Sequence, residues 1–568
     1  MISVLSTNIT SPLGFTTEQN YLAIRSGCTA LKLYEGLWGL PEPFAASLFS
    51  EELKAALAID GYTFFEAIAI RSIQEALTHI SIDVASPRVV LLLSTTKGDI
   101  EGYPSDAAQR IAKAIGVSTT PIVVCNACVS GLSAQLLASH LLSAGLYDYA
   151  IVVGAEVQSK FIVSGFQSLK AVSDEPCRPF DMERIGLNLG EAAATIIFAR
   201  EAPEWSWRLV NGAARNDAYH IVSPSPVADG QTKAIEAAMK GWDKERLATI
   251  CVHGTATLYN DQMEARAIQK AGLSDVPLSA LKGYYGHTMG AAGVLETILT
   301  MCATDDGIVL ASKGFTELGV SGKACITGDT RHTDKTSFLK LLSGFGGNNV
   351  AALFSKTMLN RQRTTGNRLQ TTGNRLHKTH TVKLSSESGV SLTDIYKQEI
   401  GNYPKFYKMD ILTRLAFVAA EMLKKESLPI EGEVWRRSPI ILFNRSSSLV
   451  ADRHYLGTIS DEKDFFPSPS LFIYTLPNIT TGEIAIRHHL QGETSFYILP
   501  EKDEALMQQI VEATLKATGV TSAISGWADA ESDTSFECEL SIYQTTDNGQ
   551  RTTDNGQRTT GRSVVGCL

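Results

Sequence analysis

Cys125 and Cys128 are the first residues of this sequence whose types and spacing could do chemistry. They lie in VVCNACVSGLSAQLL, between a short apolar run and a longer apolar segment. A thiol at the start of a helix meets free N–H groups and the positive end of the helix dipole, which favour the thiolate. A fall of about 1.5 units from a free pKa of about 8.5 would ionise half of it at neutral pH. The spacing therefore predicts that Cys128 is a nucleophile at a strand-to-helix turn.

The same CxxC pattern has other interpretations. A structural zinc site needs four ligands, and the sequence has no second CxxC or paired Cys/His cluster. A thioredoxin-like dithiol also lies between strand and helix, but this long chain does not look like that small fold. On the cysteines alone, Cys128 could equally be a small buried apolar residue.

Two histidines strengthen the interpretation as a nucleophile. His253 lies in CVHGTATLYNDQMEA, just after an apolar run, and His287 lies in LKGYYGHTMGAAG, before an apolar helical segment. A single histidine between strand and loop is more often a structural residue. Two of them beside glycines, both downstream of a candidate thiol nucleophile, favour a catalytic site.

The elements that must position these side chains alternate between strands and helices. Residues 88–94, 121–124 and 149–156 read as buried strands, and 135–145 reads as the helix between two of them. Further strands are expected in ATIIFA, TICVHG, GIVLAS and KLLSGFG. Near-continuous apolar strands alternating with helices predict an α/β fold with covered, mostly parallel sheets.

Two low-complexity segments interrupt this pattern. TTGNRLQ is followed by TTGNRLH within 364–377, and TTDNGQR is repeated within 545–558. A period of seven suggests a coiled coil, but the apolar a and d positions are missing and every unit contains Gly and Asn. We interpret 357–380 as a linker and 545–568 as a solvated tail.

The region between them, 381–544, repeats the order of about the first 200 residues in a degenerate form. A helical pattern at 406–423 precedes the strand IILF, and a helix at 504–519 precedes a strand at 520–529. The stretch FYILPEKDEAL stands where strand, cysteine and helix would be, with Pro500 and Glu501 near the nucleophile position. We predict an inactive copy that lacks the histidine half.

Composition limits the function classes. The chain has 568 residues, a net charge of -9 and 44% hydrophobic residues, which predicts several cored domains. The acidic balance argues against a general binder of nucleic acid or membrane surfaces. Nine irregularly spaced cysteines argue against a disulfide framework. The N-terminus does not look like a signal peptide, and no apolar stretch is long enough to span a bilayer. We expect a soluble cytoplasmic protein.

Taken together, the motifs resemble the β-ketoacyl synthase family. The resemblance rests on ACVSG, HGTAT, GHTMGAAG and SGFGGNN, with RPFDMERIGLNLGEAA at 178–193, and covers about residues 1–356 in one colinear order. It implies the thiolase fold, two βα halves stacked in five layers, α-β-α-β-α. The second region resembles the first half of this family too, in the manner of non-condensing partner subunits called chain-length factors.

The resemblance also implies roles for individual residues. Cys128 would carry the acyl group, and His253 and His287 would hydrogen-bond the malonyl thioester carbonyl. The backbone N–H groups of Cys128 and Phe345 would form the oxyanion hole, with Phe345 as a gate. The remaining matches are a lysine beside the second histidine, its supporting carboxylates, the residues that touch the pantetheine arm, and the acyl-pocket position: Lys282; Asp261, Glu264 and Glu296; Thr255 and Thr257; Leu187.

The expected function is a 3-oxoacyl-acyl-carrier-protein synthase that condenses malonyl-carrier with an acyl group by a decarboxylative Claisen reaction. The setting would be fatty-acid or polyketide-type synthesis, such as aryl polyene or resorcinol lipids. The alternatives are a chain-length-setting scaffold that does not condense, or another thiolase-fold acyltransferase; thiolases generally use a second catalytic cysteine, which SGFGGNN lacks. No metal or bound cofactor is expected, because phosphopantetheine arrives on the acyl carrier protein.

The expected partners are that carrier and a second synthase-like subunit, in a homodimer or heterodimer, with no nucleic acid and no membrane span. The predicted domains are 1–200 with the cysteine, 201–356 with the histidines, the linker 357–380, the inactive half 381–544 and the tail 545–568. Three departures from the family stand out. The segment 99–120 is short, Leu187 and Asn188 stand where the family has an aromatic pocket residue and its neighbour, and Asn348 replaces a common threonine.

Overall fold

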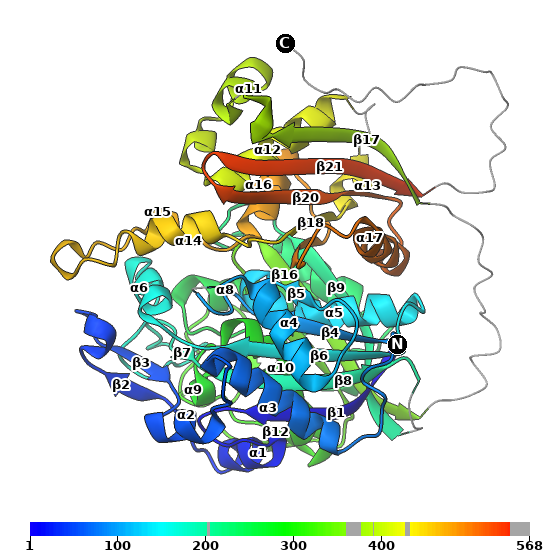
Figure 1. Ribbon diagram of the computed structural model, residues 1–568. Helices are drawn as coiled ribbons and strands as arrows, with labels where there is room; N and C mark the ends of the chain where they lie inside the picture. Colours follow the sequence, from blue (N-terminus) through cyan, green and yellow to red (C-terminus); the bar gives the residue numbers. More distant parts are fainter. Residues whose placement is uncertain (101, 202–204, 359–375, 390, 427–431, 546–568) are drawn as a thin grey trace.

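A single sixteen-stranded sheet system runs through the protein (Figure 1). The computed structural model describes residues 1–100, 102–201, 205–358, 376–389, 391–426 and 432–545. The strand order is β13-β11-β10-β15-β16-β9-β1-β8-β6-β4-β5-β19-β18-β20-β21-β17. The order divides into three sheets. Two of them belong to residues 1–358, the first body, and join where β1 pairs with β9. The third belongs to the C-terminal region, residues 376–545.

The first sheet carries the strand that leads to Cys128. Its strands, in spatial order, are β1 (Ile2–Thr10), β8 (Ala192–Ala199), β6 (Tyr149–Glu156), β4 (Val89–Ser94) and β5 (Ile122–Val124). β4 pairs in parallel with β5 and β6, whereas β8 pairs antiparallel with β6 and β1. The prediction of mostly parallel sheets is therefore right for the three central strands and wrong for the flanking ones.

The second sheet carries the strands that lead to the histidines and to Phe345. It consists of β13 (Cys325–Ile326), β11 (Pro277–Ser279), β10 (Leu247–Cys251), β15 (Ser337–Gly344), β16 (Asn348–Met358) and β9 (Trp205–Asn216). β10 pairs in parallel with β11 and β15, and β16 pairs antiparallel with β15 and β9.

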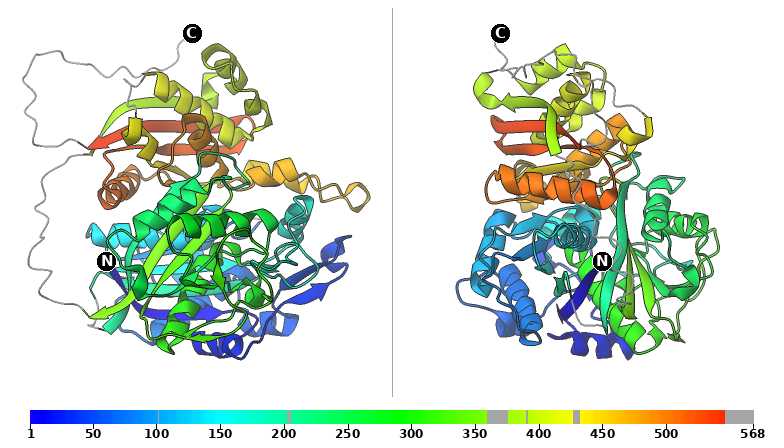
Figure 2. Two further views of the ribbon diagram at one scale, coloured as in Figure 1. Left: turned by 180° about the vertical axis from the view of Figure 1, so that it is seen from behind. Right: turned by 90° about the vertical axis from the view of Figure 1, so that its right-hand side faces the viewer.

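Helices fill the space between the two sheets and cover their outer faces, giving the five layers seen from the side in Figure 2. α5 (Ser130–Ser143) and α10 (Ala292–Asp305) contact strands of both sheets, while α3 (Phe64–Thr78) covers the first and α7 (Asp229–Ala238) the second. α5 is buried on nearly all sides, which explains why SGLSAQLLASHLLS lacks a charged face. The thiolase-like α-β-α-β-α fold is confirmed.

The C-terminal copy, residues 376–545, reproduces the first sheet. Its strands are β17 (Leu376–Ser385), β21 (Ser535–Thr545), β20 (Ser522–Ser532), β18 (Ile440–Asn444) and β19 (Thr494–Ile498). Their spatial order matches β1, β8, β6, β4 and β5, and α12 (Ile411–Glu426) and α17 (Glu504–Thr518) occupy the places of α3 and α5. No second histidine-bearing sheet follows in the part of this copy that the structure describes.

The two bodies join edge to edge through β5 and β19. These strands pair antiparallel, with Tyr497 opposite Val124 and Ile498 opposite Val123. α5 and α17 pack together beneath this seam, and hydrophobic side chains of both bodies form common cores. Because β5 and β19 are equivalent strands, their antiparallel pairing relates the bodies by a local two-fold axis. Val124 pairs with the last residue of β4 and Ile498 with the last residue of β18, so Val124 and Ile498 are equivalent. The C-terminal copy therefore packs on the synthase-like body of its own chain.

That axis identifies the counterpart of the cysteine. Cys128 lies four residues past the end of β5, and Lys502 lies four residues past the end of β19. Lys502 pairs at 3.0 Å with Glu539. Pro500 and Glu501, predicted to lie near the nucleophile position, immediately precede Lys502, so the C-terminal copy has an ammonium group in place of the thiol.

The solvent face of α17 is polar. Gln508, Gln509, Glu512 and Lys516 are exposed, whereas Leu506, Met507, Ile510 and Val511 are buried. The equivalent helix α5 is buried on nearly all sides because a second sheet covers it. α17 is thus an amphipathic outer helix, which is what a half-sized body without a second sheet requires.

The structure corrects the predicted segment boundaries. β16 continues to Met358 and β17 begins at Leu376, so both ends of the predicted linker 357–380 are strand. Residues 359–375 of that linker and 546–568 of the predicted tail lie outside the described residues. The prediction of a linker and a tail is not tested there.

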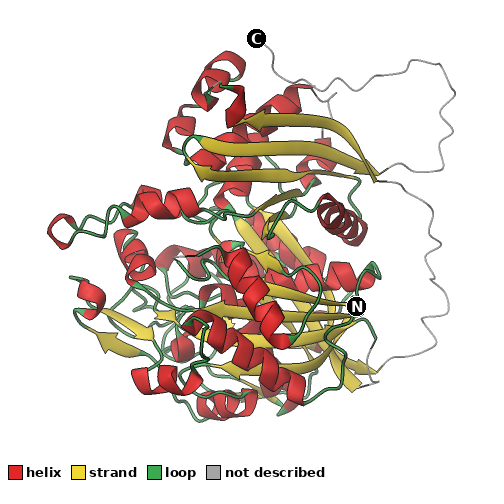
Figure 3. Ribbon diagram, in the orientation of Figure 1, coloured by secondary structure: helices red, strands yellow, loops and turns green. Residues whose placement is uncertain are grey.

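Shorter elements complete the chain, as Figure 3 shows by type. The helices are α1 (Thr17–Arg25), α2 (Glu51–Leu57), α4 (Pro104–Ile115), α6 (Lys160–Ser168), α8 (Leu258–Lys270), α9 (Lys282–Tyr285), α11 (Leu392–Glu399), α13 (Gly432–Arg437), α14 (Leu449–Leu456), α15 (Pro469–Tyr474) and α16 (Ile479–His488). The strands are β2 (Lys32–Tyr34), β3 (Phe44–Ser47), β7 (Leu189–Gly190), β12 (Ile308–Val309) and β14 (Arg331–His332). None of the described helices combines the length and the apolar character needed to cross a membrane.

Candidate active site

Cys128 lies on the tight turn between β5 and α5. Ala127, just before it, has the left-handed backbone value φ 50°, a strained conformation for a non-glycine residue. The turn is held by Ser130, whose hydroxyl accepts from the Asn126 N–H at 2.8 Å and donates to the Ala127 carbonyl at 2.6 Å. The C-terminal copy also braces it, because the Asn126 side chain accepts a hydrogen bond of 2.7 Å from the Phe496 N–H.

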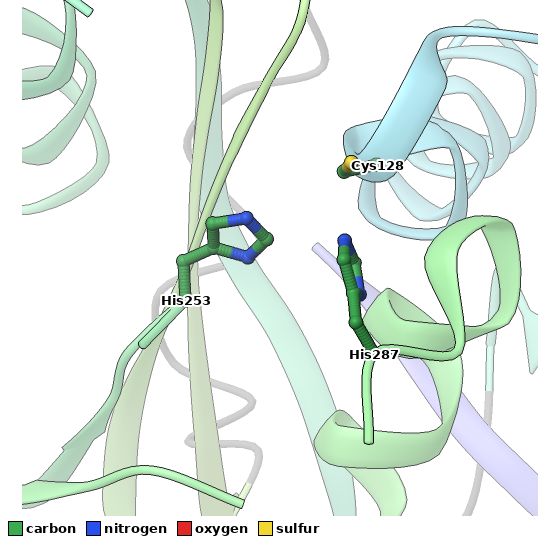
Figure 4. A group of neighbouring side chains, drawn as sticks. All are labelled: Cys128, His253 and His287. Atoms are coloured by element: carbon green, nitrogen blue, oxygen red, sulfur yellow. The ribbon is translucent and has the colours of Figure 1, made fainter. Parts of the chain in front are cut away.

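The two histidines converge on this cysteine (Figure 4). His253 follows β10, and His287 lies between α9 and α10. Their rings are T-shaped, with centroids 5.2 Å apart and planes at 80°. One side-chain atom each of Cys128, His253 and His287 lie within 4.8 Å of one another. Three residues from separate motifs are thereby brought to one point.

The hydrogen bonds of His287 define its tautomer. Its Nδ1 accepts a bond of 3.2 Å from the Met289 N–H, so the neutral ring carries its proton on Nε2. Among the described residues, this Nε2 and the Nδ1 of His253 are buried without a hydrogen-bond partner. Nε2 of His287 is thus an available donor, aimed at the space beside the thiol.

Both imidazoles are held in the neutral form. Burial lowers the pKa of His253 and of His287 well below the usual value of 6.5, and the nearby Lys282 and Lys340 ammonium groups lower both further. Neutral rings can donate to a carbonyl oxygen without placing a full positive charge beside a carboxylate that must leave.

The thiol differs from expectation. Burial raises the pKa of Cys128 to about 12, and Lys282 offsets only part of this effect. The predicted fall towards neutrality from the helix N-terminus is therefore wrong, because desolvation of the thiolate outweighs the helix dipole. Cys128 keeps partial exposure to a cavity, whereas Cys125 is fully buried and its thiol donates to the Thr96 carbonyl at 3.3 Å. The thiol of Cys128 is therefore protonated at neutral pH, and it must lose its proton while its sulfur attacks a substrate.

The predicted supporting residues divide into two groups. Lys282 donates to Glu296 at 2.7 Å and to the His253 carbonyl at 2.6 Å, so this pair lies where expected. Asp261 and Glu264 do not touch Lys282. Glu264 instead accepts from the His253 and Gly254 N–H groups at 2.7 and 2.9 Å, and Asp261 accepts from Thr255 at 3.0 Å. These carboxylates hold the loop that carries His253.

A cavity of about 390 Å³ leads from the surface to Cys128 and both histidines. Thr255, Thr257 and Leu187 line it, as predicted, and the exposed Ile185 and Leu258 lie at its rim. The two threonine hydroxyls are 2.9 Å apart. The cavity is therefore a mainly apolar passage with a few polar groups, the two threonine hydroxyls among them.

Asn188, one of the departures from the family, does not line the large cavity. Its side chain accepts from the Cys177 N–H at 2.6 Å and donates to the carbonyls of Ser173 and Glu175 at 3.2 and 2.9 Å. Asn348, the other departure, accepts from the Thr494 hydroxyl of the C-terminal copy.

Phe345 stands beside the nucleophile in the turn after β15. A Cβ on the preceding Gly344 would lie 3.4 Å from the backbone nitrogen of Cys128, so the two turns touch. The Phe345 carbonyl accepts a hydrogen bond of 2.8 Å from Asn478. Behind them, a Cβ on Gly482 would lie 2.7 Å from the Gly346 carbonyl. Helix α16 therefore supports the Phe345 loop directly.

A second, smaller cavity of about 20 Å³ lies behind Cys128. Phe166, Met289 and Phe345 line it from the first body, and Phe472, Thr475 and Leu476 close it from the C-terminal copy. Lys97 lies at the same boundary, where its ammonium group donates to Asp452 at 2.6 Å, to Ser448 at 3.0 Å and to the Thr475 carbonyl.

Sequence reasoning missed the residues that the C-terminal copy supplies, and it also missed Lys340. No local motif marks Phe472 or Asn478, because their role arises only from the pairing of β5 with β19. Lys340 did leave a signal: it is a charged residue inside the apolar strand SFLKLLSG.

A metal ion is the other chemistry that a thiol and two imidazoles suggest. Metal-binding histidines normally donate with their second ring nitrogen, but Nδ1 of His287 accepts. The donor set therefore fits hydrogen bonding to a substrate better than it fits a metal.

The fold and the site define a thiolase-like protein with a Cys-His-His centre. Comparison with known families gives two matches: the β-ketoacyl synthase N-terminal domain at residues 81–203 and the β-ketoacyl synthase C-terminal domain at residues 208–316. Cys128 falls in the first, and both histidines fall in the second. This part of the chain is therefore similar to the β-ketoacyl synthase family over both of its domains.

Individual relatives agree. The chain is 32% identical over 259 residues to 3-oxoacyl-[acyl-carrier-protein] synthase 2 of Mycobacterium leprae, an alignment that covers 41% of this chain and 60% of that protein. The chain thus spans less than two thirds of the length of this relative.

Solved structures extend the likeness of fold. The PfaC keto synthase–chain length factor aligns with a TM-score of 0.76 at 15% identity, covering 97% of this chain and 79% of that one. The ketosynthase ApeO in complex with its chain length factor ApeC, from Xenorhabdus doucetiae, aligns with a TM-score of 0.54 at 21% identity, covering 63% of this chain and 98% of that one.

Proposed function

We propose that the protein is a 3-oxoacyl-acyl-carrier-protein synthase whose C-terminal copy takes the place of a non-condensing partner subunit. The observation that carries the proposal is the convergence of Cys128, His253 and His287 within 4.8 Å at the end of a cavity about 390 Å³ in volume. The substrates are an acyl thioester and a malonyl thioester, each on a carrier protein, for fatty-acid or polyketide-type synthesis.

In the first half-reaction, the sulfur of Cys128 attacks the acyl thioester. A C–S bond to Cys128 forms, the bond to the pantetheine sulfur breaks, and the thiol proton ends on the departing pantetheine. A neutral imidazole can relay that proton, and Nδ1 of His253 has no partner among the described residues. In the proposed mechanism the N–H groups of Cys128 and Phe345 hold the oxyanion; such donors typically contribute about 3–4 kcal/mol each.

In the second half-reaction, the malonyl thioester loses CO₂. The electron pair of the broken C–C bond forms an enolate, whose oxygen accepts from Nε2–H of His287 and from His253. The enolate carbon attacks the acyl carbonyl on Cys128, the Cys128 sulfur leaves as a thiolate and takes a proton from solvent, and a 3-oxoacyl thioester results. Both imidazoles are neutral, which suits donors to an enolate. The reaction needs no metal or bound cofactor, because the pantetheine arrives on the carrier.

The C-terminal copy contributes structure rather than chemistry. Lys502 replaces the nucleophile, while Phe472, Thr475 and Leu476 close the small cavity behind Cys128. We assign this cavity to the end of the acyl group, so the copy limits acyl length. A decayed remnant would not be expected to retain such contacts.

The same pairing bears on assembly. The sheet edge of β5 is occupied by β19 of the same chain, so a second subunit cannot pair there. We propose that the chain works without the separate synthase-like partner expected from sequence, and that a carrier protein docks at the mouth of the large cavity. A cytoplasmic location stays a prediction.

The test of this proposal is to cut the chain between the two bodies. A chain ending at residue 358 should expose the β5 edge and the apolar side chains that pack on α17, and should aggregate or lose condensation. Co-expression of residues 376–545 as a separate chain should restore solubility and condensation. A truncated chain with the melting behaviour and products of the full protein would overturn the role of the C-terminal copy.

A further inference from the structure

Lys340 is a fully buried lysine in the middle of β15. Its neighbours Phe338, Leu339, Leu341 and Leu342 are buried and apolar, and none of its own surface is exposed. Removing an ammonium group from water is costly unless it is paired. An uncharged residue at this position would avoid that cost. The presence of a buried lysine here therefore suggests that its charge has a function.

The contacts of Lys340 lead to the active site. Its Nζ donates to Glu296 at 2.6 Å and to the Val252 and Cys251 carbonyls at 3.2 and 3.3 Å. The other oxygen of Glu296 accepts from Lys282 at 2.7 Å, and Lys282 donates to the His253 carbonyl. One carboxylate is thus shared by two lysines, all three being buried, and Cys251 and Val252 immediately precede His253.

This cluster of Lys282, Glu296 and Lys340 carries one net positive charge. Glu296 can neutralise only one of its two partners, so an excess ammonium charge remains beneath the histidines. Like charge nearby disfavours protonation of an imidazole, and positive charge favours a developing enolate.

We infer that Lys340 is a positioning residue of the condensation site, and that its charge, through the cluster with Glu296 and Lys282, keeps His253 and His287 uncharged and able to donate to the enolate. This inference rests on the proposed condensation. It assigns to Lys340 a role that the sequence motifs do not indicate.

The surrounding charges agree with this role. Burial is the largest cause that lowers the pKa of both histidines, and Lys282 and Lys340 act in the same direction on both. Burial would raise the pKa of Glu296, but the two lysines outweigh it and hold that pKa below its usual value. Other groups facing the site are Cys128 on its turn, Cys251 at the end of β10, and Glu264 on α8, whose pKa burial raises to about 7.

The experiment compares three variants of the full chain. Lys340→Gln keeps hydrogen-bond donors but removes the charge, and Lys340→Met removes both. Lys340→Gln with Glu296→Gln removes one charge of each sign, which restores the net positive charge of the cluster. The readout is the titration of His253 and His287 by NMR of histidine-labelled protein, assigned with His253→Gln and His287→Gln.

In the wild type, both imidazoles should stay neutral well below pH 6.5, since burial and the two lysines lower the pKa of each. Lys340→Gln and Lys340→Met should raise the pKa of at least one imidazole by about one unit, the scale of one charge about 10 Å away in a protein interior. The acid limb of CO₂ release from malonyl-carrier should move up with it. The double variant should return the titration towards the wild type, even if its melting temperature stays low.

An unchanged histidine titration in Lys340→Gln would overturn the inference and leave Lys340 a structural donor to the two carbonyls. Titration of both histidines near pH 6.5 in the wild type would also overturn it, without any variant. If Lys340→Met fails to fold, the Gln variants still decide. If the wild type releases no CO₂, the proposed function fails, while the histidine titration still tests Lys340.

Discussion

The side-chain amide of Asn478 donates a hydrogen bond of 2.8 Å to the carbonyl oxygen of Phe345. Asn478 belongs to the C-terminal copy, and Phe345 stands beside the nucleophile on the synthase body. The copy thus fixes the backbone of the loop that carries the proposed gate and one oxyanion donor. The C-terminal copy has no cysteine at the equivalent position, yet it contributes to the active site of the synthase body.

Asn478→Ala should lower the rate of condensation by about tenfold. The change leaves the Phe345 carbonyl unsatisfied, at a cost of about 1–3 kcal/mol, and frees the loop to move. The measurement is product formation with acyl-carrier and malonyl-carrier. Asn402→Ala is the matched control, because Asn402 is an exposed residue of the same copy that accepts from Arg487. Equal rates in the two variants would argue against support of the loop by Asn478.

Phe472→Ala should lengthen the acyl groups that the enzyme accepts. The ring closes the small cavity behind Cys128, and its removal opens space towards Leu476. Loss of a buried phenylalanine should also lower stability, by about 3–5 kcal/mol. The readout is mass spectrometry of Cys128 after exposure to carriers with acyl chains of graded length. Phe466→Ala is the control, since Phe466 is 77% exposed. An unchanged length profile would place the acyl end elsewhere.

Iodoacetamide should label Cys128 ahead of Cys125, because Cys128 lines the large cavity whereas Cys125 is fully buried. Burial raises the pKa of Cys128 to about 12, so the thiolate fraction should keep growing with pH. The labelling rate should therefore rise across the whole range from pH 7 to 10 without a plateau. A plateau near pH 7 would show a low-pKa thiolate after all, and faster labelling of Cys125 would remove Cys128 as the nucleophile.

His253→Ala and His287→Ala should separate the two half-reactions. Acyl transfer needs the sulfur and the oxyanion donors, whereas loss of CO₂ needs the imidazole donors. Each variant should still accumulate acyl-Cys128, with CO₂ release from malonyl-carrier reduced by about 10²–10³-fold, the usual cost of one such donor. Wild-type CO₂ release in both would rule out the donor roles.

The local elements of the synthase body were predictable because the pattern of residues within a short stretch of sequence determines each of them. Continuous apolar runs marked β4 and β6, and the glycine-flanked His253 marked the end of β10. The antiparallel pairing of β8 was not predictable, since a buried strand looks apolar whichever way its neighbour runs.

What sequence could not supply depends on contacts between distant segments. The pKa of Cys128 followed burial rather than the helix dipole. The burial of this turn arises from contacts between distant segments and cannot be predicted from the CxxC pattern. Which of Asp261, Glu264 and Glu296 contacts the lysine, and which hold the loop that carries the first histidine, could be learned only from the geometry of that loop. Phe472 and Asn478 entered the site only because β19 pairs with β5.

The central claim is that Cys128, His253 and His287 form a site that makes a carbon–carbon bond between two substrates. The most direct measurement is intact-mass analysis of the carrier protein after incubation of the full chain with acyl-carrier and malonyl-carrier. The wild type should give a 3-oxoacyl-carrier longer than the starting acyl group by two carbons, with release of CO₂, and Cys128→Ala should give none. Absence of the 3-oxoacyl product from a folded wild type with every carrier-bound acyl group tried, or its formation by Cys128→Ala, would contradict the account.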